Sequence, residues 1–562
     1  MPLPNKDDDA LASALQASDL TPPDPEREFD YDWVVIGSGF GGSVSALRLA
    51  EKGYRVLVLE RGRRFADDEL PASTSQSSRY LWMPKAGLYG IFRIMPLRQV
   101  LVGAGCGVGG GSLGYGAALY RADPDCFREP QWAELADWNQ ELDAHYAAAE
   151  HMLGVDGSAQ PSTSASLLDE YAAERGFSET CHTPPLGIFL GTPGVTVPDP
   201  YFGGAGPERT GCIRCGACMT GCRVGAKNTL TKNYLWFAEK AGVRVLAECE
   251  AIDIRPRGAD DGSDGYRVEY RRPGNSRPEE PTAITCGAVV FAAGALGTVE
   301  LLHRCKAAGS LPRLSDQVGY GVRTNGESVV AVTGPRGTDF TRSTGITRAA
   351  RPDSRTLIEA STYGPGADSQ SPLFWPLTDA ADVRGVIRRL ASTALRDPRR
   401  TARSLRVRGW SRRTMIVLVM SRTDGTIRLR AKGVRRDGSI RLATEPGPVV
   451  PAVRVPAAYD FANWLAQRIG GSAQATISES TRNIPTTVHL LGGAAIGAGP
   501  DTGVVDPDHR VFGYRNLLVC DGSVLPVDLG VNPSLTITAL AERAMSKIPA
   551  RIPVPTGLPV QQ

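Results

Sequence analysis

Apolar and polar positions near the start of the chain predict a strand, a tight turn and a helix in direct succession. Residues 32–36 form a short apolar run, residues 37–42 are rich in glycine, and apolar residues then recur at helical spacing up to Leu49. A second apolar run at 55–59 ends in Glu60. This order predicts the strand–helix–strand unit of a doubly wound α/β sheet.

Apolar patterns farther along the chain predict more elements. Residues 517–520 predict a strand, and residues 536–545 predict a helix that follows it. Apolar residues near helical spacing at 132–152 predict a packed helix. Residues 356–361 predict a strand in which Glu359 interrupts an otherwise apolar pattern.

The length of 562 residues predicts two to four domain-sized units. We expect a disordered lead at 1–29, a cofactor domain at 30–125, 240–330 and 485–550, a substrate domain at 126–239 and 331–484, and a tail at 551–562.

Charge and hydropathy exclude several classes of protein. Lys plus Arg number 63 against 60 Asp plus Glu, a net charge of +3, which is too balanced for a nucleic-acid binder. The chain begins without the basic and apolar segments of a signal peptide, and its longest aliphatic runs, such as 415–420, fall far short of the roughly 20 residues that span a bilayer. We therefore expect a cytoplasmic protein without a transmembrane segment.

The first turn indicates a bound dinucleotide. Gly37 permits a tight turn, Gly39 lets the backbone approach a pyrophosphate, and Gly42 lets the helix pack closely with its N-terminus toward the anion. Glu60 is placed to accept hydrogen bonds from a ribose and to repel the 2′-phosphate of NADP. The alternative is a doubly wound unit that binds no nucleotide.

Two further segments favour FAD over NAD. Eight of the fourteen residues from 103 to 116 are glycine, which indicates backbone pressed against a ligand. The predicted strand at 517–520 ends in Asp521 and Gly522, and the helix that follows is expected to start toward the flavin. Three distant segments that converge on one cofactor suit FAD better than NAD.

Several motifs resemble those of the glucose-methanol-choline (GMC) flavin oxidoreductases, and within them of the cholesterol oxidases. They are Gly-Ser-Gly-Phe-Gly-Gly at 37–42, Gly-Gly-Gly-Ser at 109–112, Phe-Ala-Ala-Gly-Ala-Leu-Gly at 291–297, His-x-x-Gly-Gly at 489–493 and Gly-Val-Asn-Pro at 530–533. The resemblance implies a Rossmann-like, discontinuous FAD domain and a substrate domain on a mixed or antiparallel sheet with helices. The expected cofactor-binding residues are Gly37, Ser38, Gly39, Phe40, Gly41, Gly42, Glu60, Gly111, Ser112, Tyr115, Gly116, Ala251, Gly294, Asp521 and Gly522.

The resemblance also implies three catalytic residues. His489 would hydrogen-bond the substrate hydroxyl and help to remove its proton, while Asn532 would lie against the flavin edge. A core histidine and an ordinary turn are the alternatives for these two. Glu359 would carry a proton during double-bond isomerisation, unless it is a strand acid turned to solvent.

The implied reaction is FAD-dependent oxidation of a hydrophobic secondary alcohol, a 3β-hydroxysteroid such as cholesterol, to the 3-keto product, followed by isomerisation. Oxygen or a redox protein would accept the electrons. One alternative is a dehydrogenase that passes electrons through an iron–sulfur cluster to an acceptor other than oxygen. Another is a lyase, isomerase or electron carrier that keeps the flavin fold.

A cysteine-rich insert at 211–223 departs from ordinary secreted cholesterol oxidases and resembles an intracellular branch of them. Cys212, Cys215, Cys218 and Cys222 have the C-x2-C-x2-C-x3-C spacing of bacterial ferredoxins, with Arg223 where a proline usually follows. An iron–sulfur cluster, a zinc ion and metal-free thiols are the three interpretations. The odd total of eleven cysteines does not suit a disulfide framework.

Eight arginines lie between Arg396 and Arg413, interleaved with apolar residues. They predict either a peripheral contact with an anionic membrane surface or a solvated helix face.

Overall fold

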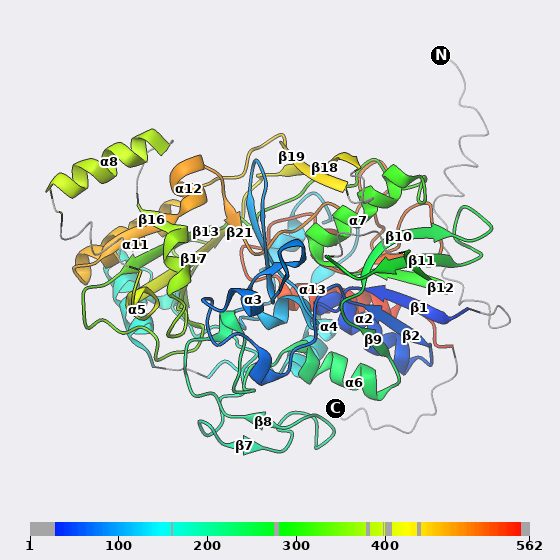
Figure 1. Cartoon of the computed structure of the whole chain (residues 1–562), viewed down its shortest axis with the longest axis horizontal. Coiled ribbons are helices and arrows are strands. Elements are labelled where there is room, and N and C mark those ends of the chain that lie inside the picture. The colour runs from blue at the N-terminus through cyan, green and yellow to red at the C-terminus, as the bar shows by residue number, and fades with distance from the viewer. Residues whose placement is uncertain are drawn as a thin grey trace, which may run out of the picture.

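The structure is a computed structural model that describes residues 29–158, 161–274, 280–377, 383–396, 398, 407–434 and 440–551. Two large sheets dominate it, one toward each end of the long axis (Figure 1). The expected lead and tail, apart from Phe29 and Arg551, lie outside the described residues. So does half of the arginine run at 396–413, including Arg399, Arg400, Arg403 and Arg406.

The first sheet carries the doubly wound unit. Its strand order is β10-β11-β12-β1-β2-β9, with β22 also paired to β12. The pairs β12–β1, β1–β2, β2–β9 and β12–β22 are parallel, while β10–β11 and β11–β12 are antiparallel. Its strands are β1 (Tyr31–Ile36), β2 (Val56–Leu59), β9 (Arg244–Leu246), β10 (Glu250–Pro256), β11 (Tyr266–Arg271), β12 (Thr282–Phe291) and β22 (Leu517–Val519).

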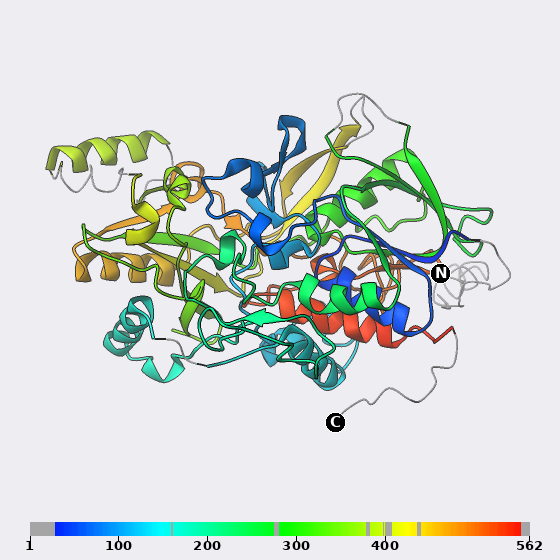
Figure 2. The same cartoon turned by 60° about the horizontal axis from the view of Figure 1, so that its bottom comes forward.

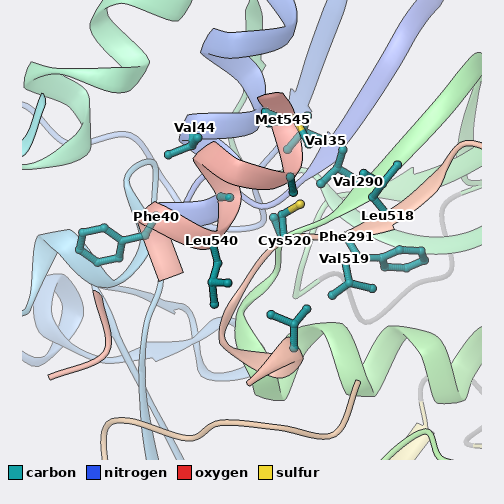
Figure 3. Packing of buried hydrophobic residues seen from close by; sticks show 14 of the residues in the cluster. Val35, Phe40, Val44, Val290, Phe291, Leu518, Val519, Cys520, Leu540 and Met545 are labelled. Carbon is teal, nitrogen blue, oxygen red and sulfur yellow. The ribbon is translucent and has the colours of Figure 1, made fainter. Parts of the chain in front are cut away.

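Helices from opposite ends of the chain pack together on this sheet. After β1 the chain turns into α2 (Phe40–Glu51), which packs against α13 (Ser534–Ser546). Arg48 of α2 donates from Nε to a carboxylate oxygen of Glu542 at 2.7 Å. Figure 3 shows side chains of β1, β12, β22, α2 and α13 gathered in one apolar core. Its labelled residues are Val35, Phe40, Val44, Val290, Phe291, Leu518, Val519, Cys520, Leu540 and Met545.

The second sheet is antiparallel throughout, with strand order β14-β15-β17-β13-β20-β16. Its strands are β14 (Ile346–Ala350), β15 (Thr356–Ser361), β17 (Thr414–Ser421), β13 (Ser328–Thr333), β20 (Ser472–Thr476) and β16 (Phe374–Pro376). Helices α5 (Thr163–Arg175) and α11 (Pro456–Arg468) pack on it around a second apolar core. All six residues of β15 are buried, because neighbouring strands and layers cover both faces.

A small three-stranded sheet joins the segment that precedes His489 to the strand that precedes the glycine-rich loop. β21 (Thr486–Thr487) pairs in parallel with β6 (Leu101–Gly105), which also pairs with β5 (Phe92–Pro96). This pairing sets the start of the His489 segment beside the strand that leads into the glycine-rich loop.

Shorter elements complete the fold (Figures 1 and 2). The paired strands are β3 (Trp82–Met83) with β4 (Leu88–Tyr89), β7 (Thr196–Val197) with β8 (Arg209–Thr210), and β18 (Ile427–Val434) with β19 (Ile440–Pro446). The other helices are α3 (Ser77–Tyr80), α4 (Trp138–Leu153), α6 (Tyr234–Lys240), α7 (Gly294–Ala308), α8 (Val383–Arg396), α10 (Trp410–Arg413) and α12 (Ile477–Arg482).

The predicted fold class, a Rossmann-like doubly wound unit beside a domain on an antiparallel sheet with helices, is confirmed. The expected packed helix at 132–152 is α4, which begins after the Asp137 cap and ends at Gly154 in a left-handed conformation. The boundaries of the two domains remain a prediction. Among the described residues, no helix combines the length and the apolar character needed to cross a membrane.

Candidate active site

A large cavity lies where the glycine-rich turn, the glycine-rich loop and the C-terminal segment meet. Thirteen of the expected cofactor-binding residues line it: Gly37, Ser38, Gly39, Phe40, Gly41, Glu60, Gly111, Tyr115, Gly116, Ala251, Gly294, Asp521 and Gly522. His489 and Asn532 line the same cavity. Residues separated by hundreds of positions in the sequence therefore face one space.

The glycines of the first turn differ in what surrounds them. A Cβ atom would lie 2.2 Å from the Ala292 carbonyl oxygen at Gly37, 1.7 Å from the Cys520 carbonyl oxygen at Gly41, and 2.1 Å from the Gly37 carbonyl oxygen at Gly42. At Gly39 it would meet nothing within 4 Å. Three of the glycines thus allow close packing, while Gly39 leaves its backbone open to the cavity.

This end of the cavity fits the diphosphate of FAD. Helix α2 begins at Phe40, its N-cap Gly39 provides no side-chain hydrogen bond, and its first turn contains no acidic residue. Its first N–H groups are therefore available to an anion, which the helix dipole also favours. Glu60, which follows β2 and lines the cavity, accepts hydrogen bonds from the Ser38 hydroxyl at 2.8 Å and the Gly62 N–H at 2.8 Å.

Asp521 joins two of the segments that meet at the cavity. One carboxylate oxygen accepts from the Gly294 N–H at 2.9 Å, and the other accepts from the Ser523 N–H at 2.8 Å. Burial raises the pKa of this carboxyl, although its hydrogen bonds oppose the shift. The contact fixes the start of α7 against the end of β22.

Two of the expected cofactor residues, Gly42 and Ser112, do not line the cavity. The Ser112 hydroxyl donates to the Gly109 carbonyl at 2.7 Å and accepts from the Leu230 N–H at 3.1 Å. The Ser112 side chain therefore holds the shape of the glycine-rich loop.

Glu359 is buried and contacts the side chain of Asn532. The Asn532 Nδ2 group donates to a carboxylate oxygen of Glu359 at 3.3 Å, and Glu359 is 0% exposed. The alternative of a strand acid turned to solvent is therefore wrong. The other oxygen of Glu359 and the Asn532 Oδ1 are buried without a hydrogen-bond partner among the described residues. Both atoms are available to a bound ligand or water.

A second buried carboxylate, Glu327, contacts His489 and has no counterpart among the predicted residues. One of its oxygens lies against the Nδ1 atom of His489 in an ion-pair contact. The other accepts from the Val488 N–H at 2.8 Å. In the sequence Glu327 is an acid that precedes an apolar strand, a pattern equally common at solvated strand ends, so no local signal identifies it.

Both carboxylates act on the ionisation of the imidazole, and the imidazole acts on that of Glu359. Burial raises the pKa of Glu359 to about 7, against the opposing effect of His489. Burial alone would lower the pKa of His489, but the charges of Glu327 and Glu359 raise it above its usual value. Glu359 can therefore exchange a proton near neutral pH, while His489 keeps its proton to a higher pH than a free imidazole.

Apolar side chains line much of the remaining cavity. They include Phe92, Val102, Ile346, Leu418, Ile440, Val488, Leu490 and Ile537. A cavity of this kind suits a ligand with a large apolar body and few polar groups.

The four cysteines of the insert line a second, smaller cavity together with Lys227. Among the described residues, no group of three or more His, Cys, Asp or Glu side chains is arranged to hold a single metal ion. The structure therefore brings the four predicted ligands together without forming a compact site for one ion.

Comparisons with known proteins agree with this geometry. A family profile described as FAD dependent oxidoreductase matches residues 32–415, and one described as GMC oxidoreductase matches residues 425–541. A cholesterol oxidase of Mycobacterium tuberculosis (strain ATCC 25618 / H37Rv) is 45% identical, over 92% of this chain and 91% of that protein. A cholesterol oxidase of Acinetobacter baumannii is 40% identical, over 93% of this chain and 95% of that protein.

One solved structure shows a similar fold at low sequence identity. Pyridoxine 4-oxidase from Mesorbium loti superposes with a TM-score of 0.58 at 16% identity, covering 92% of this chain and 98% of its own. At this identity the likeness concerns the fold alone.

Proposed function

Because this chain belongs to the FAD-dependent GMC oxidoreductases, which act on CH–OH donors, we propose that it oxidises a hydrophobic secondary alcohol, a 3β-hydroxysteroid such as cholesterol, to the 3-keto product. The observation that carries the proposal is the placement of His489 and Asn532 in the cavity that the glycine-rich turn and the apolar side chains also line. A sterol as the substrate is supported by the two relatives named cholesterol oxidase, which match this chain over 91% and 95% of their own length.

Bound FAD supplies the acceptor for the hydride that leaves the alcohol carbon. His489 removes the hydroxyl proton, since the hydride leaves easily only as the oxygen loses its proton. Glu327 accepts a hydrogen bond from the Nδ1–H group of His489, which leaves Nε2 of the neutral ring as the proton acceptor. Asn532, held by its hydrogen bond to Glu359, orients the alcohol at the flavin edge.

Glu359 gives the site a second proton carrier. A carboxyl group with a pKa of about 7 is half ionised at neutral pH. It can take a proton from the carbon next to the new carbonyl and return it farther along the conjugated system. We propose that this step moves the double bond of the 3-keto product after oxidation.

An anaerobic absorption experiment tests the oxidation. The purified holoenzyme is mixed with a 3β-hydroxysteroid in the absence of oxygen. We expect the absorption band of the oxidised flavin in the blue region of the spectrum to bleach. The 3α-epimer is the matched control, because it presents the same apolar body with the hydroxyl misplaced. Absence of bleaching with every alcohol class tested would favour a lyase, an isomerase or an electron carrier instead.

A second candidate function concerns the acceptor. Four cysteines line a cavity next to the flavin-binding region, which favours a dehydrogenase that passes electrons through an iron–sulfur cluster to an acceptor other than oxygen. Measuring turnover with oxygen and with ferricyanide distinguishes the two acceptors.

A further inference from the structure

We propose that Cys212, Cys215, Cys218 and Cys222 hold an iron–sulfur cluster that carries electrons out of the flavin site to a one-electron acceptor. The source of those electrons rests on the proposed function, whereas the binding of the cluster does not. Four observations support the site: its lining, its backbone donors, a buried ammonium group and its contact with the flavin cavity.

The lining is that of a cluster site. All four cysteines border one cavity, and most of its other walls are apolar side chains, namely Ile188, Ile213, Ala217, Val224 and Ala226. Thiolates in an apolar, water-poor pocket are the usual ligands of iron–sulfur clusters. Positive φ angles at Arg214, Gly216 and Gly221 (54°, 69° and 100°) turn the loop tightly enough to point its cysteines inward.

Backbone N–H groups donate to two of the cysteine sulfurs. The Arg214 N–H lies 3.4 Å from the Cys212 sulfur, and the Gly345 N–H lies 3.3 Å from the Cys218 sulfur. Gly345 comes from another part of the chain, just before β14. Hydrogen bonds to ligating sulfur stabilise its negative charge and tune the potential of a cluster.

Lys227 provides an independent indication of negative charge at this site. Its side chain is 0% exposed, and its ammonium group donates to three neutral carbonyl oxygens, those of Cys218, Leu113 and Tyr115, at 2.7, 2.9 and 3.2 Å. A buried charge needs a compensating charge close by. A cluster bound by four thiolates is an anion, and the ammonium group lies on the wall of its cavity.

The same contacts join the cysteine cavity to the flavin cavity. Met219, which follows Cys218 in the turn Cys218–Thr220, lines the flavin cavity. Tyr115, whose carbonyl accepts from Lys227, lines it as well. One turn of chain thus borders both cavities, so an electron would cross a single layer of residues.

The electrons balance as follows. Each alcohol that becomes a ketone releases two electrons and two protons. A cluster carries one electron at a time, so two successive transfers reach two molecules of a one-electron acceptor. The hydroxyl proton leaves through His489, and the second proton, which left the carbon as hydride, is released to solvent when the reduced flavin gives up its two electrons.

The test begins with protein purified anaerobically. We expect iron and acid-labile sulfide in whole-number ratio to FAD, and an electron paramagnetic resonance signal of a cluster after reduction by dithionite. Cys222→Ser should lose iron, sulfide and the signal, whereas Cys181→Ser, a partly buried cysteine outside the insert, should keep them. Protein that contains FAD but neither iron nor sulfide, or zinc in their place, would overturn the proposal even if no variant folds.

Activity separates this proposal from the proposed function. With a 3β-hydroxysteroid, Cys222→Ser should still bleach its flavin anaerobically but reduce ferricyanide at least tenfold more slowly than Cys181→Ser. An equal ferricyanide rate in both variants would remove the electron-transfer role. A cluster in protein whose flavin no alcohol bleaches would refute the sterol oxidation and leave the cluster site standing.

Discussion

His489 lies between two carboxylates that have separate tasks. Glu327 contacts Nδ1 from the side of β13, whereas Glu359, on β15, acts on the ring through its charge and accepts a hydrogen bond from Asn532. Because both carboxylates are fully buried, neither is screened by water. The charge of His489 therefore depends on neighbours that substrate does not need to touch.

Replacing Glu327 by Gln tests its role in positioning the imidazole. Glu327 raises the pKa of His489, and His489 must be neutral to accept a proton. In Glu327→Gln we expect the acid limb of the pH profile of kcat/KM to move to lower pH. We also expect kcat to fall roughly 10- to 100-fold, as for other lost partners of functional histidines.

Glu479→Gln is the matched control for that variant. Glu479 is also 0% exposed and accepts from the Ser328 hydroxyl at 3.1 Å at the start of β13, without contact to His489. An acid limb that shifts equally in both variants would mean that a general change in β13 is responsible.

Replacing Glu359 by Gln separates the two chemical steps. We expect oxidation to be retained within about tenfold, because Gln can still accept from Asn532, while isomerisation falls by roughly 10²–10⁴. In the wild type the isomerisation rate should rise with pH through about 7, since the ionised carboxylate takes the proton. Product analysis by ultraviolet absorption of the conjugated ketone measures both steps, and equal loss of both would contradict the assignment.

At the scale of elements, helices, strands and turns that depend on neighbouring residues can be predicted from the sequence, whereas contacts between distant residues cannot. The turn at 37–42, α2, β2, β22 and α13 follow from apolar periodicity and glycine spacing within a few residues. Glu327 escapes prediction because His489 lies over a hundred residues away in the sequence, and Lys227 because two of its three carbonyl partners, Leu113 and Tyr115, are equally distant. Ser112 does not line the cavity as expected for the same reason: its hydroxyl accepts a hydrogen bond from the N–H of Leu230, which is also distant in the sequence.

At Gly39 an added methyl group would project into the cavity, where it would meet bound FAD and no protein atom. Its φ of −72° suits alanine, and its Cβ would meet no protein atom within 4 Å. We expect Gly39→Ala to fold normally and to lose FAD affinity by at least tenfold, measured by flavin fluorescence after dialysis. Gly157→Ala, also open in space and exposed, should bind FAD normally.

Helix α12 introduces a carboxyl group that opposes stability at high pH. Burial raises the pKa of Glu479 to about 8 from its ordinary 4.5. Between these two pH values the folded state holds a proton that the unfolded state has released. The contribution of Glu479 to the free energy of unfolding is therefore fully present below about pH 4.5 and is lost as the pH rises to 8. Relative to Glu479→Gln, the wild type should lose a few kcal/mol between pH 5 and 8, at about 1.4 kcal/mol per unit. A Tm difference between the two proteins that does not change with pH would contradict this.

At the scale of the whole molecule, the cofactor cavity is the place where separated segments meet. The fold class and the family could be predicted from the sequence, because the glycine motifs that carry them are local. The cytoplasmic location and the membrane contact at 396–413 remain predictions. The apolar cavity walls come from both sheets and from the strands between them, so the substrate does not follow from any one segment.

Removing FAD should therefore loosen the whole molecule. Ligand at about 1,000 times its Kd stabilises a fold by about 4 kcal/mol. We expect the apoprotein, made by acid ammonium sulfate treatment, to melt several degrees lower and in a broader transition. Added FAD should restore the Tm, while NAD at the same concentration should not.

The pairing of α2 with α13 also bears on how the protein is made. Gly39 and Asn532 face the same cavity, yet 493 residues separate them in the chain (532 minus 39). At a synthesis rate of about 5–20 residues per second, the first turn emerges about 25–100 s before the segment that completes its site. During that interval α2 has neither Glu542, which pairs with Arg48 across the two helices, nor the core residues of α13. We expect the flavin to be captured only after translation ends, so a cell short of FAD would accumulate finished chains waiting for cofactor rather than stalled ones.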